Sequence, residues 1–314
     1  MRLLALLIFL PCAAMAQDFP LTMEGRFGPV TIAEKPERVA TIGYAGGDDL
    51  LALGIQPVAL RYWYGDQAGA LWPWAAPLLQ AEPEVLRGEI NYEQIAASDP
   101  DVIIALWSGI GQADHDRLSR IAPVVAGPPG LGEFELPWDM RARLTGRAVG
   151  KEAEAEEQIA GITATLARIA ADHPGWQGKT ATVAQAWTGQ PGGYTSNDLR
   201  ARIMEQMGFV TPEALNDAAL GAEAFTVQLS EETLKTLDAD LILWLSQDGG
   251  FDAVEALVTR PFLNATRAGH EVFVGELLAG ALSHASLLSL PYALDGLEPA
   301  IEQAMRGEGP ARTE

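Results

Sequence analysis

The sequence feature that most constrains the fold is a long stretch without proline near the middle of the chain. It runs from Trp138 to about Asp172, between Pro137 and a His-Pro-Gly segment that begins at His173. Isoleucine and leucine recur in it at helical spacing, while glutamates mark a solvated face nearby. Proline suits the start of a helix, and a Pro-Gly pair suits its end. The pattern predicts a helix over 138–173, about 50 Å long at roughly 1.5 Å per residue.

Two glycines leave the continuity of this helix open. Gly146 and Gly150 each weaken a helix interior by about 1 kcal/mol relative to alanine. The stretch could therefore be two packed helices with a turn near Gly150. In either case it divides the chain into two halves, residues 17–137 and 174–314, whose patterns resemble each other.

The first residues are typical of a secretory signal peptide. A basic start at Arg2 is followed by a short apolar run, 3–10, and by an Ala-Met-Ala site that ends at Ala16. Cleavage after Ala16 would remove residues 1–16 and with them Cys12, the one cysteine of the chain. We therefore expect an exported protein without disulfide or thiol chemistry.

The formal net charge of −21 argues against nucleic acid or an anionic membrane as a partner. Both require a basic surface, and this chain has 42 acidic against 21 basic residues. An acidic surface suits the capture of neutral or cationic solutes, although it could equally reflect a salty habitat.

Both halves show the alternation of strands and helices that is typical of parallel sheets. Buried strands are predicted over 38–43, 58–60, 101–106, 123–126, 180–187, 240–245 and 272–274. Helices are predicted over 48–53, 91–97, 112–121, 198–207, 230–237 and 286–305. The glycine-rich segment 189–193 lacks the lysine of a phosphate loop, and we expect it to be a turn.

A loop crowded with aromatic residues follows the predicted strand at 58–60. Within residues 61–74 it contains Tyr62, Trp63, Tyr64, Trp72 and Trp74. Core packing rarely needs such a density outside regular elements, and α/β folds place ligand contacts in the loops after parallel strands. We expect the first three aromatic residues to contact a ligand, whereas the two later tryptophans could pack the loop onto its own domain.

Two segments in corresponding places of the two halves match each other. Each has a glutamate in the first turn of a short helix, Glu93 or Glu232, and eight positions later an aspartate, Asp101 or Asp240, opens a strand. The helix dipole gives each glutamate about 0.3–1 kcal/mol, but this local effect does not explain why both halves agree. Matched acids on two lobes would allow docking onto a basic partner. Glu231 leaves the assignment in the second half open.

The sequence lacks the motifs of common exported enzymes. It contains no G-x-S-x-G elbow, no H-E-x-x-H pair and no G-x-x-x-x-G-K-[ST] phosphate loop. The histidines are isolated, without metal-ligand spacing: His115, His173, His270 and His284. We expect them on the surface or at helix caps, and we expect no enzyme, no metal centre and no cofactor. An exported enzyme remains a less favoured alternative.

Five further segments occur in a fixed order along the chain, beginning at Glu37 (ERVA), Leu50 (LLALGIQPV), Tyr92 (YEQI), Pro100 (PDVII) and Leu118 (LSRIAPV). In these segments the chain resembles the periplasmic substrate-binding proteins of iron-siderophore and vitamin B12 ABC importers. The resemblance covers essentially the whole mature chain, and the aromatic loop 61–74 is most similar to the iron-siderophore branch. It implies an α/β fold with two Rossmann-like lobes, 17–137 and 174–314, that contain parallel sheets and are joined by one long α-helix, 138–173.

The family's ligand lies in a shallow cleft between the lobes, lined by aromatic residues and often by arginine. The matching positions here are Tyr44, Arg61, Tyr62, Trp63, Tyr64, Trp107, Trp187 and Tyr194. Because basic residues near the predicted cleft are few, the resemblance favours a neutral or cationic hydroxamate-type ferric siderophore over an anionic tris-catecholate. Haem, which Tyr44, Tyr62 or Tyr194 could ligate, and cobalamin stay open as alternative cargoes.

The resemblance also implies a partner and a location. In the family, a glutamate on each lobe engages arginines of the membrane permease, and by motif these would be Glu93 and Glu232. We therefore expect a monomer in the periplasm that binds a ferric siderophore and delivers it to an ABC permease without chemical change.

Overall fold

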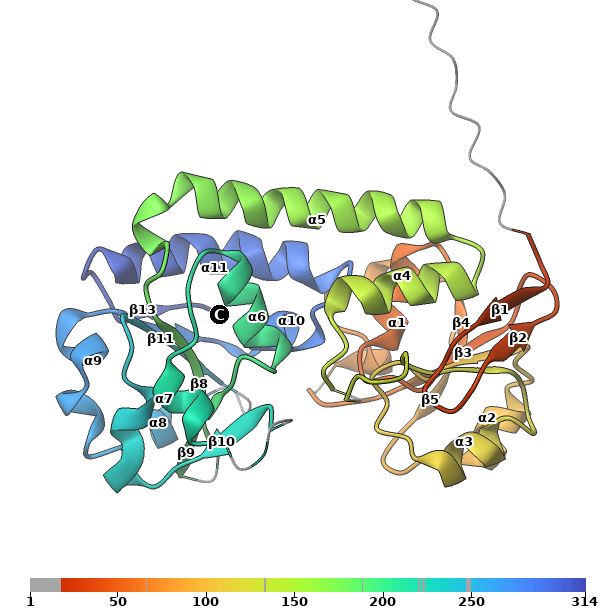
Figure 1. Cartoon of the computed structure of the whole chain (residues 1–314), viewed down its shortest axis with the longest axis horizontal. Coiled ribbons are helices and arrows are strands. Elements are labelled where there is room, and N and C mark those ends of the chain that lie inside the picture. The colour runs from red at the N-terminus through yellow and green to blue at the C-terminus, as the bar shows by residue number, and fades with distance from the viewer. Residues whose placement is uncertain are drawn as a thin grey trace, which may run out of the picture.

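The computed structural model describes residues 18–314 except Asp66, Glu133, Thr188, Leu220, 222–223 and 247–249, so the predicted signal peptide lies outside it. Two α/β lobes lie side by side, and helix α5 (Glu152–Asp172) runs along both of them (Figure 1). Within the described ranges, every helix is too short or too polar to cross a bilayer.

The N-terminal lobe is built on a five-stranded parallel sheet. Its strands, in the spatial order β5-β4-β3-β6-β7, are Glu84–Leu86, Pro57–Arg61, Val39–Thr41, Val102–Ile104 and Val124–Val125. Alternate residues of β3 and β6 face opposite layers, as the period of a strand requires. One layer contains α1 (Gly46–Ala52) and α4 (Trp138–Ala148). The other contains α2 (Tyr92–Ala97) and α3 (Gln112–Leu118).

A small antiparallel hairpin, β1 (Leu21–Met23) and β2 (Val30–Ile32), precedes this sheet. The predicted strands and helices of the lobe are all present, although most are shorter than predicted. Strand β5 was not predicted, because its three residues Glu-Val-Leu show no distinctive pattern.

The C-terminal lobe contains a six-stranded mixed sheet. Its strands, in the order β10-β9-β8-β11-β12-β13, are Thr226–Gln228, Gln190–Tyr194, Ala181–Trp187, Leu241–Leu245, Glu271–Val274 and Ala311–Arg312. The last four in this order are parallel, whereas β9 and β10 are antiparallel to their neighbours.

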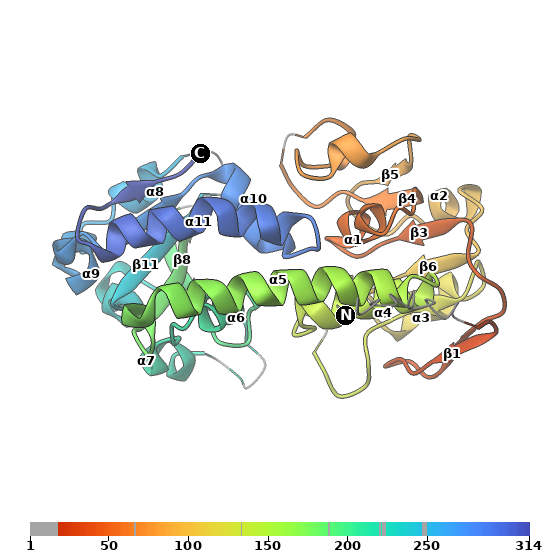
Figure 2. The same ribbon diagram turned by 90° about the horizontal axis from the view of Figure 1, so that it is seen from above.

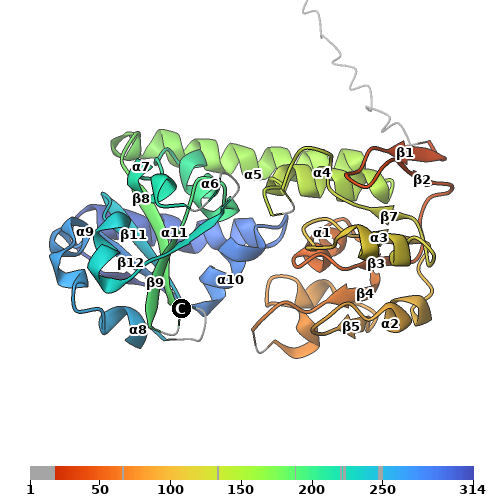
Figure 3. The ribbon, with the colours of Figure 1, turned by 60° about the horizontal axis from the view of Figure 1, so that its bottom comes forward.

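Helices cover both faces of this sheet. One layer contains α6 (Leu199–Gln206), α10 (Glu276–His284), α11 (Ser289–Met305) and α5. The other contains α7 (Glu213–Asp217), α8 (Asp252–Glu255), α9 (Asn264–Ala268) and the 3-10 helix η4 (Glu231–Leu237). Figure 3 separates the two sheets, with α5 spanning both lobes.

The prediction of a turn over 189–193 is correct only at Gly189, which lies in the turn between β8 and β9. Gly192 and Gly193 lie inside β9, which pairs with both β8 and β10. A Cβ at Gly192 would lie 2.7 Å from the Val227 carbonyl oxygen, and one at Gly193 would lie 2.7 Å from Leu237 Cδ2. The glycines are therefore needed for close packing inside the sheet. Because turns also favour glycine, a glycine-rich strand such as β9 looks like a turn in the sequence.

The prediction of one continuous helix over 138–173 is also wrong, and the alternative prediction of two packed helices is correct. α4 ends at Ala148, α5 begins at Glu152, and Gly150 between them has φ +70°, a left-handed conformation that favours glycine. A Cβ at Gly146 would lie 2.5 Å from the Ala155 Cβ atom, so the two helices pack closely.

Of the helices α4 and α5, it is α5 that continues from one lobe to the other. Near its start, Gln158 Nε2 donates to the Ala52 carbonyl oxygen of the N-terminal lobe at 2.9 Å. Near its end, the Arg168 guanidinium donates to the Glu298 carboxylate of α11 at 3.1 and 2.8 Å. Figure 2 shows α5 and α11 side by side over the C-terminal lobe.

The internal repeat has a structural basis in Asp101 and Asp240. Asp101 Oδ2 accepts hydrogen bonds from the backbone N–H of Glu37 and Arg38 at 2.7 and 3.0 Å, just before β3. Asp240 Oδ2 accepts one from the backbone N–H of Thr180 at 2.8 Å, just before β8. Each aspartate thus fixes the start of its strand against the parallel neighbour, in the same way in both lobes.

Candidate ligand-binding site

A cluster of aromatic side chains lies where the two lobes meet. The Trp63 ring centroid lies 5.6 Å from that of Tyr44, 4.6 Å from that of Tyr64 and 5.2 Å from that of Trp107. His284, the last residue of α10 in the C-terminal lobe, lies 5.2 Å from Trp63 and 5.9 Å from Tyr64. The rings therefore pack across the junction of the lobes.

We call this group the aromatic cluster: Tyr44, Trp63, Tyr64, Trp72, Trp74, Trp107, Phe134 and His284. Tyr44, Trp63 and Trp107 come directly after the adjacent strands β3, β4 and β6. The carboxyl ends of parallel strands meet at one edge of a sheet, which is where α/β folds bind ligands. The order of strands and loops in the sequence therefore brings these rings together.

Backbone strain accompanies the site at Trp107. Its φ is +56°, which a non-glycine residue adopts rarely and at a cost of about 1–3 kcal/mol. Its carbonyl oxygen accepts a hydrogen bond from the Tyr44 N–H at 3.2 Å. At the neighbouring Gly43, a Cβ would lie 2.1 Å from the Leu106 carbonyl oxygen, so only glycine fits. Close contact between these two backbone segments sets the position of both rings.

Tyr64 lies against the C-terminal lobe, with its ring centroid 5.9 Å from that of His284. Burial raises the pKa of this tyrosine to about 12, although Ser283 of α10 and Arg200 partly lower it. Tyr64 therefore remains neutral at physiological pH inside the aromatic cluster.

The arginines at the site already have partners. The Arg61 guanidinium lies over the Tyr44 ring at 4.2 Å and donates to the Ser108 carbonyl oxygen at 2.9 Å. Arg200 lies over the Tyr194 ring at 4.3 Å and donates to both carboxylate oxygens of Asp198, at 3.0 and 2.8 Å. Asp198 therefore neutralises the charge of Arg200, whereas the hydrogen-bond partners of Arg61 are neutral oxygens.

A buried polar network fixes the two lobes to each other near the cluster. Arg141 of α4 donates to Asp49 Oδ2 of α1 at 2.9 Å, and to the carbonyl oxygens of His284 and Ala285 at 3.0 and 2.8 Å. Asp49 Oδ1 also accepts from the Leu287 N–H at 3.0 Å. The buried ion pair of Arg141 and Asp49 therefore holds the α10–α11 connection against the N-terminal lobe through hydrogen bonds. This is a second link between the lobes, in addition to α5.

The predicted site residues separate into two groups. Tyr44, Trp63, Tyr64 and Trp107 belong to the aromatic cluster, and Arg61 and Tyr194 border on it through their cation-π contacts. Tyr62 does not join it: its hydroxyl donates to the Gly65 carbonyl oxygen at 2.7 Å, and Arg87 lies over its ring at 4.1 Å. Trp187 ends β8, and its side chain lies outside what the structure describes.

Trp72 and Trp74 pack the loop and also belong to the cluster. Their rings stack at 5.1 Å, and they lie 5.7 and 5.8 Å from His284. His284 is the main residue that the sequence analysis missed. A surface position is wrong for it, because its exposed fraction is 5%, whereas the alternative of a position at a helix end is correct: His284 is the last residue of α10, and its Nδ1 lies 2.9 Å from the Gly280 carbonyl oxygen. Burial lowers its pKa to about 3, with further contributions from Arg141 and Arg200.

The cluster encloses little free space. The pocket lined by residues such as Asp48, Trp63, Tyr64, Trp72 and His284 has a volume of about 10 Å³. This is room for about one water molecule. A larger ligand would have to displace some of these rings as it enters. Among the described residues, no group of three or more His, Cys, Asp or Glu is placed to hold a metal ion directly.

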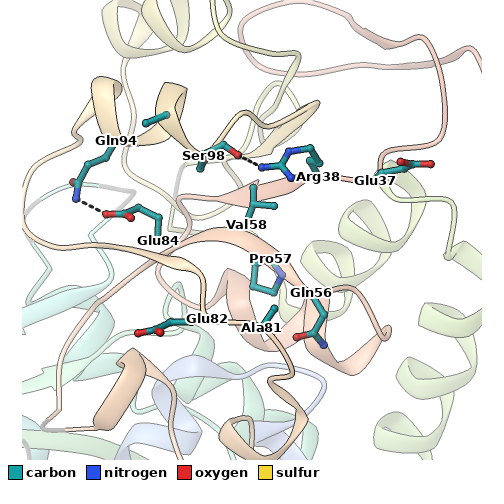
Figure 4. Close-up of a pocket in the computed structure, with 11 residues that line it drawn as sticks. Glu37, Arg38, Gln56, Pro57, Val58, Ala81, Glu82, Glu84, Gln94 and Ser98 are labelled. Carbon is teal, nitrogen blue, oxygen red and sulfur yellow. Dashed lines mark hydrogen bonds between the residues drawn. The ribbon is translucent and has the colours of Figure 1, made fainter.

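A larger hollow of about 530 Å³ lies elsewhere, at the amino ends of β3 and β4 in the N-terminal lobe (Figure 4). Its lining is polar and acidic rather than aromatic, and includes Glu37, Arg38, Gln56, Glu82, Glu84 and Gln94. Some of its side chains bond to each other or to backbone, as when Gln94 Nε2 donates to Glu84 Oε1 at 2.7 Å. None of the residues that line it is aromatic, in contrast to the junction of the lobes.

The paired glutamates are exposed in both lobes. Glu93 lies in the first turn of α2, and Glu232 in the first turn of η4. Neither carboxylate has a hydrogen bond or ion pair among the described residues. Glu231 differs, because its carboxylate accepts a hydrogen bond from the Val258 N–H. Of the two neighbours, Glu232 is therefore the one whose carboxylate is available to a partner.

Comparison with known proteins agrees with this architecture. The family described as periplasmic binding protein matches residues 39–274. Over 223 residues, the chain is 29% identical to the probable siderophore-binding lipoprotein YfiY of Bacillus subtilis (strain 168). That match covers 68% of this chain and 65% of the lipoprotein, slightly less than two thirds of its length.

Solved structures are similar over nearly their whole length. A periplasmic solute binding protein from Mycobacterium smegmatis is 32% identical, with a TM-score of 0.78, and the match covers 90% of this chain and 98% of that one. The iron uptake ABC transporter substrate-binding protein PiaA from Streptococcus pneumoniae, in complex with ferrichrome, is 28% identical. Its TM-score is 0.75, and the match covers 91% of this chain and 99% of that one.

These relatives confirm the resemblance to substrate-binding proteins of iron-siderophore importers and the fold of two α/β lobes with a long connecting helix. The family and its relatives bind substrates and are not enzymes, as the sequence analysis predicted.

Proposed function

Because the chain belongs to the periplasmic binding protein family, we propose that it captures a ferric siderophore between its two lobes and delivers it to an ABC permease. The observation that carries this proposal is the aromatic cluster at the junction of the lobes, centred on Trp63. The relatives support the cargo, since one is called siderophore-binding and another was solved with ferrichrome.

The electrostatics of the site favour a hydroxamate-type siderophore. A ferric tris-catecholate carries several negative charges, and burying them needs free cations nearby. Arg141 and Arg200 are neutralised by Asp49 and Asp198, so Arg61 is the one of the three site arginines whose described partners are all neutral oxygens, and one cation is too few for several negative charges. A neutral or cationic ferric trihydroxamate instead needs aromatic faces for its apolar envelope and cationic groups, which the cluster supplies.

We propose that the ligand enters through rotation of side chains and without a large movement of one lobe relative to the other. Helix α5 and the buried Arg141–Asp49 pair both connect the lobes, so a wide hinge opening would break an ion pair whose members are 1% and 0% exposed. Removing the partner of a buried charge costs about 3–5 kcal/mol. Rotation of Trp63 and Tyr64 away from His284 is the less costly way to open the site.

Export and docking complete the proposal. The signal peptide predicted over 1–16, cleaved after Ala16, would place the mature protein in the periplasm as a monomer. The exposed carboxylates of Glu93 and Glu232, one on each lobe, would then pair with basic groups of the permease. Rim charges of this kind steer a partner and fix its orientation.

Quenching of tryptophan fluorescence tests the cargo. The mature protein is titrated with a ferric trihydroxamate, a ferric tris-catecholate, haemin and cobalamin, with the iron-free trihydroxamate as control. We expect the ferric trihydroxamate to bind at least tenfold more tightly than the other three. A Soret band that shifts on addition of haemin, with no response to the chelates, would establish haem as the cargo in place of a siderophore.

A further inference from the structure

The pocket inside the aromatic cluster contains two hydrogen-bond acceptors to which the described part of the chain offers no donor. Asp48 Oδ2 accepts from Trp74 Nε1 at 2.7 Å and from Ser286 Oγ at 2.8 Å, whereas Asp48 Oδ1 has no partner among the described residues. His284 Nδ1 lies 2.9 Å from the Gly280 carbonyl oxygen, and the described residues offer no partner to Nε2. Asp48 and His284 are 3% and 5% exposed, and both line the pocket.

The protonation of His284 follows from its neighbour. A carbonyl oxygen can only accept a hydrogen bond, so Nδ1 must carry the proton and Nε2 must present a lone pair. Burial lowers the pKa of this histidine to about 3, so Nε2 stays an acceptor at physiological pH. The pocket therefore offers a neutral acceptor from the C-terminal lobe beside a carboxylate from the N-terminal lobe.

Aromatic faces surround these acceptors. Trp63, Tyr64 and Trp72 line the same pocket, and their ring centroids lie 5.2, 5.9 and 5.7 Å from that of His284. Aromatic rings around a carboxylate form the arrangement that attracts organic cations, because each ring face carries partial negative charge. The volume of about 10 Å³ admits one group the size of a water molecule or an ammonium group.

We propose that this pocket is a subsite for one ammonium group, so that the protein selects ferric hydroxamate siderophores that carry a free amine. The proposal rests on the proposed function and specifies its ligand further. The ammonium group donates to Asp48 Oδ1 and His284 Nε2, with its remaining charge against the rings. The ferric centre then lies outside the pocket, toward Tyr44 and Trp107.

The charges that face Asp48 support this assignment. Asp49 of α1 adds a negative charge, and Arg141 of α4 a positive one that is already paired with Asp49. Arg61 lines the pocket, but it donates to backbone carbonyl oxygens and lies over Tyr44. Burial raises the pKa of Asp48 to about 6, so its carboxylate is ionised at pH 7.5. A ligand ammonium group would supply a positive charge beside it.

The test compares two forms of one chelate. A linear ferric trihydroxamate with a terminal ammonium group, and the same chelate with its amine acetylated, are titrated into the mature protein. We expect the ammonium form to bind about tenfold more tightly at pH 7.5. In Asp48→Asn, which keeps an acceptor for Trp74 and Ser286, this preference should fall to about twofold or less. Asp172→Asn, which removes an exposed carboxylate at the far end of α5, should keep it.

The pH dependence gives a second measurement. As the pH falls below about 6, Asp48 takes up a proton, so the preference for the ammonium form should decrease, whereas it should be constant in Asp48→Asn. Equal binding of both forms by the wild type would mean that the pocket holds only an internal water, and the proposal would be wrong while the siderophore function stands. If no ferric siderophore binds at all, the proposed function itself is wrong and the subsite falls with it.

Discussion

Trp63 is one of the residues that connect the aromatic side chains of the two lobes. Its ring contacts Tyr44, Tyr64 and Trp107 of the N-terminal lobe and His284 of the C-terminal lobe. The aromatic loop could be recognised from the sequence, because the tryptophans and tyrosines are crowded after a predicted strand. His284 could not, since it is isolated in the sequence and is brought to the loop only by packing between the lobes.

Replacing Trp63 and Tyr64 by alanine should weaken siderophore binding. The loss of two aromatic contacts predicts an increase in Kd of about 100-fold, with little change in the folded state because both side chains are only partly buried. Tyr62→Ala is the matched control: Tyr62 lies in the same loop but outside the cluster, and its variant should bind like the wild type. An equal loss in both variants would mean that the loop, and not the cluster, binds the ligand.

Replacing His284 by glutamine should change how stability depends on pH. The pKa of His284 is lowered to about 3, so the unfolded chain binds a proton near pH 6.5 that the folded chain excludes. Stability is therefore fully present above the unfolded pKa and decreases as the pH falls toward 3. Between pH 7 and 5 the wild type should lose about 2 kcal/mol more than the variant in urea denaturation. Parallel losses would show that His284 can be protonated in the folded state.

The helices and strands show which features of this fold follow from local sequence. Asp101 and Asp240 could be matched from the sequence because they have the same role in the two lobes. Each accepts a hydrogen bond from a backbone N–H just before a strand, β3 or β8, and each follows its glutamate at the same spacing. The sequence does not decide whether α4 and α5 are one helix or two. The same glycines could weaken a single helix or allow two helices to pack. The glycines of β9 were misread, since close sheet packing and a turn select the same residue.

Two glycine-to-alanine substitutions distinguish packing from helix propensity. At Gly146, the new Cβ would lie 2.5 Å from Ala155 Cβ and 2.9 Å from the Lys151 carbonyl oxygen, so Gly146→Ala should destabilise the protein by about 1–3 kcal/mol. Gly161 of α5 has open space around it, and Gly161→Ala should stabilise the protein by up to about 1 kcal/mol. Thermal denaturation of both variants measures the difference, and a stabilising Gly146→Ala would show that α4 and α5 do not pack closely.

The whole molecule consists of two lobes, built on sheets of five and six strands, that meet at one junction. The division into lobes could be predicted from the proline-free stretch between them. The connection between the lobes through Arg141, Asp49 and Leu287 could not, because it joins residues far apart in the chain without a shared pattern. This connection makes the junction a fixed site, which the proposed small-scale opening requires.

Docking onto the permease is predicted to be separable from ligand binding. Replacing Glu93 and Glu232 together by alanine should reduce siderophore uptake by cells to the background level, because both carboxylates are exposed and unpaired among the described residues. The Kd for the siderophore should stay within about twofold, as the glutamates lie outside the aromatic cluster. Glu154 and Glu157, two exposed acids on α5, serve as the control pair. Wild-type uptake by the Glu93/Glu232 variant would remove their docking role.

The position of the iron tests the central claim most directly. A crystal of the mature protein grown with a ferric trihydroxamate allows the iron to be located by its anomalous scattering. We expect one peak between the lobes, beside Tyr44, Trp63 and Trp107. A peak in the hollow lined by Glu37 and Glu84, or on the outer surface of either lobe, would contradict a binding site made by the aromatic cluster.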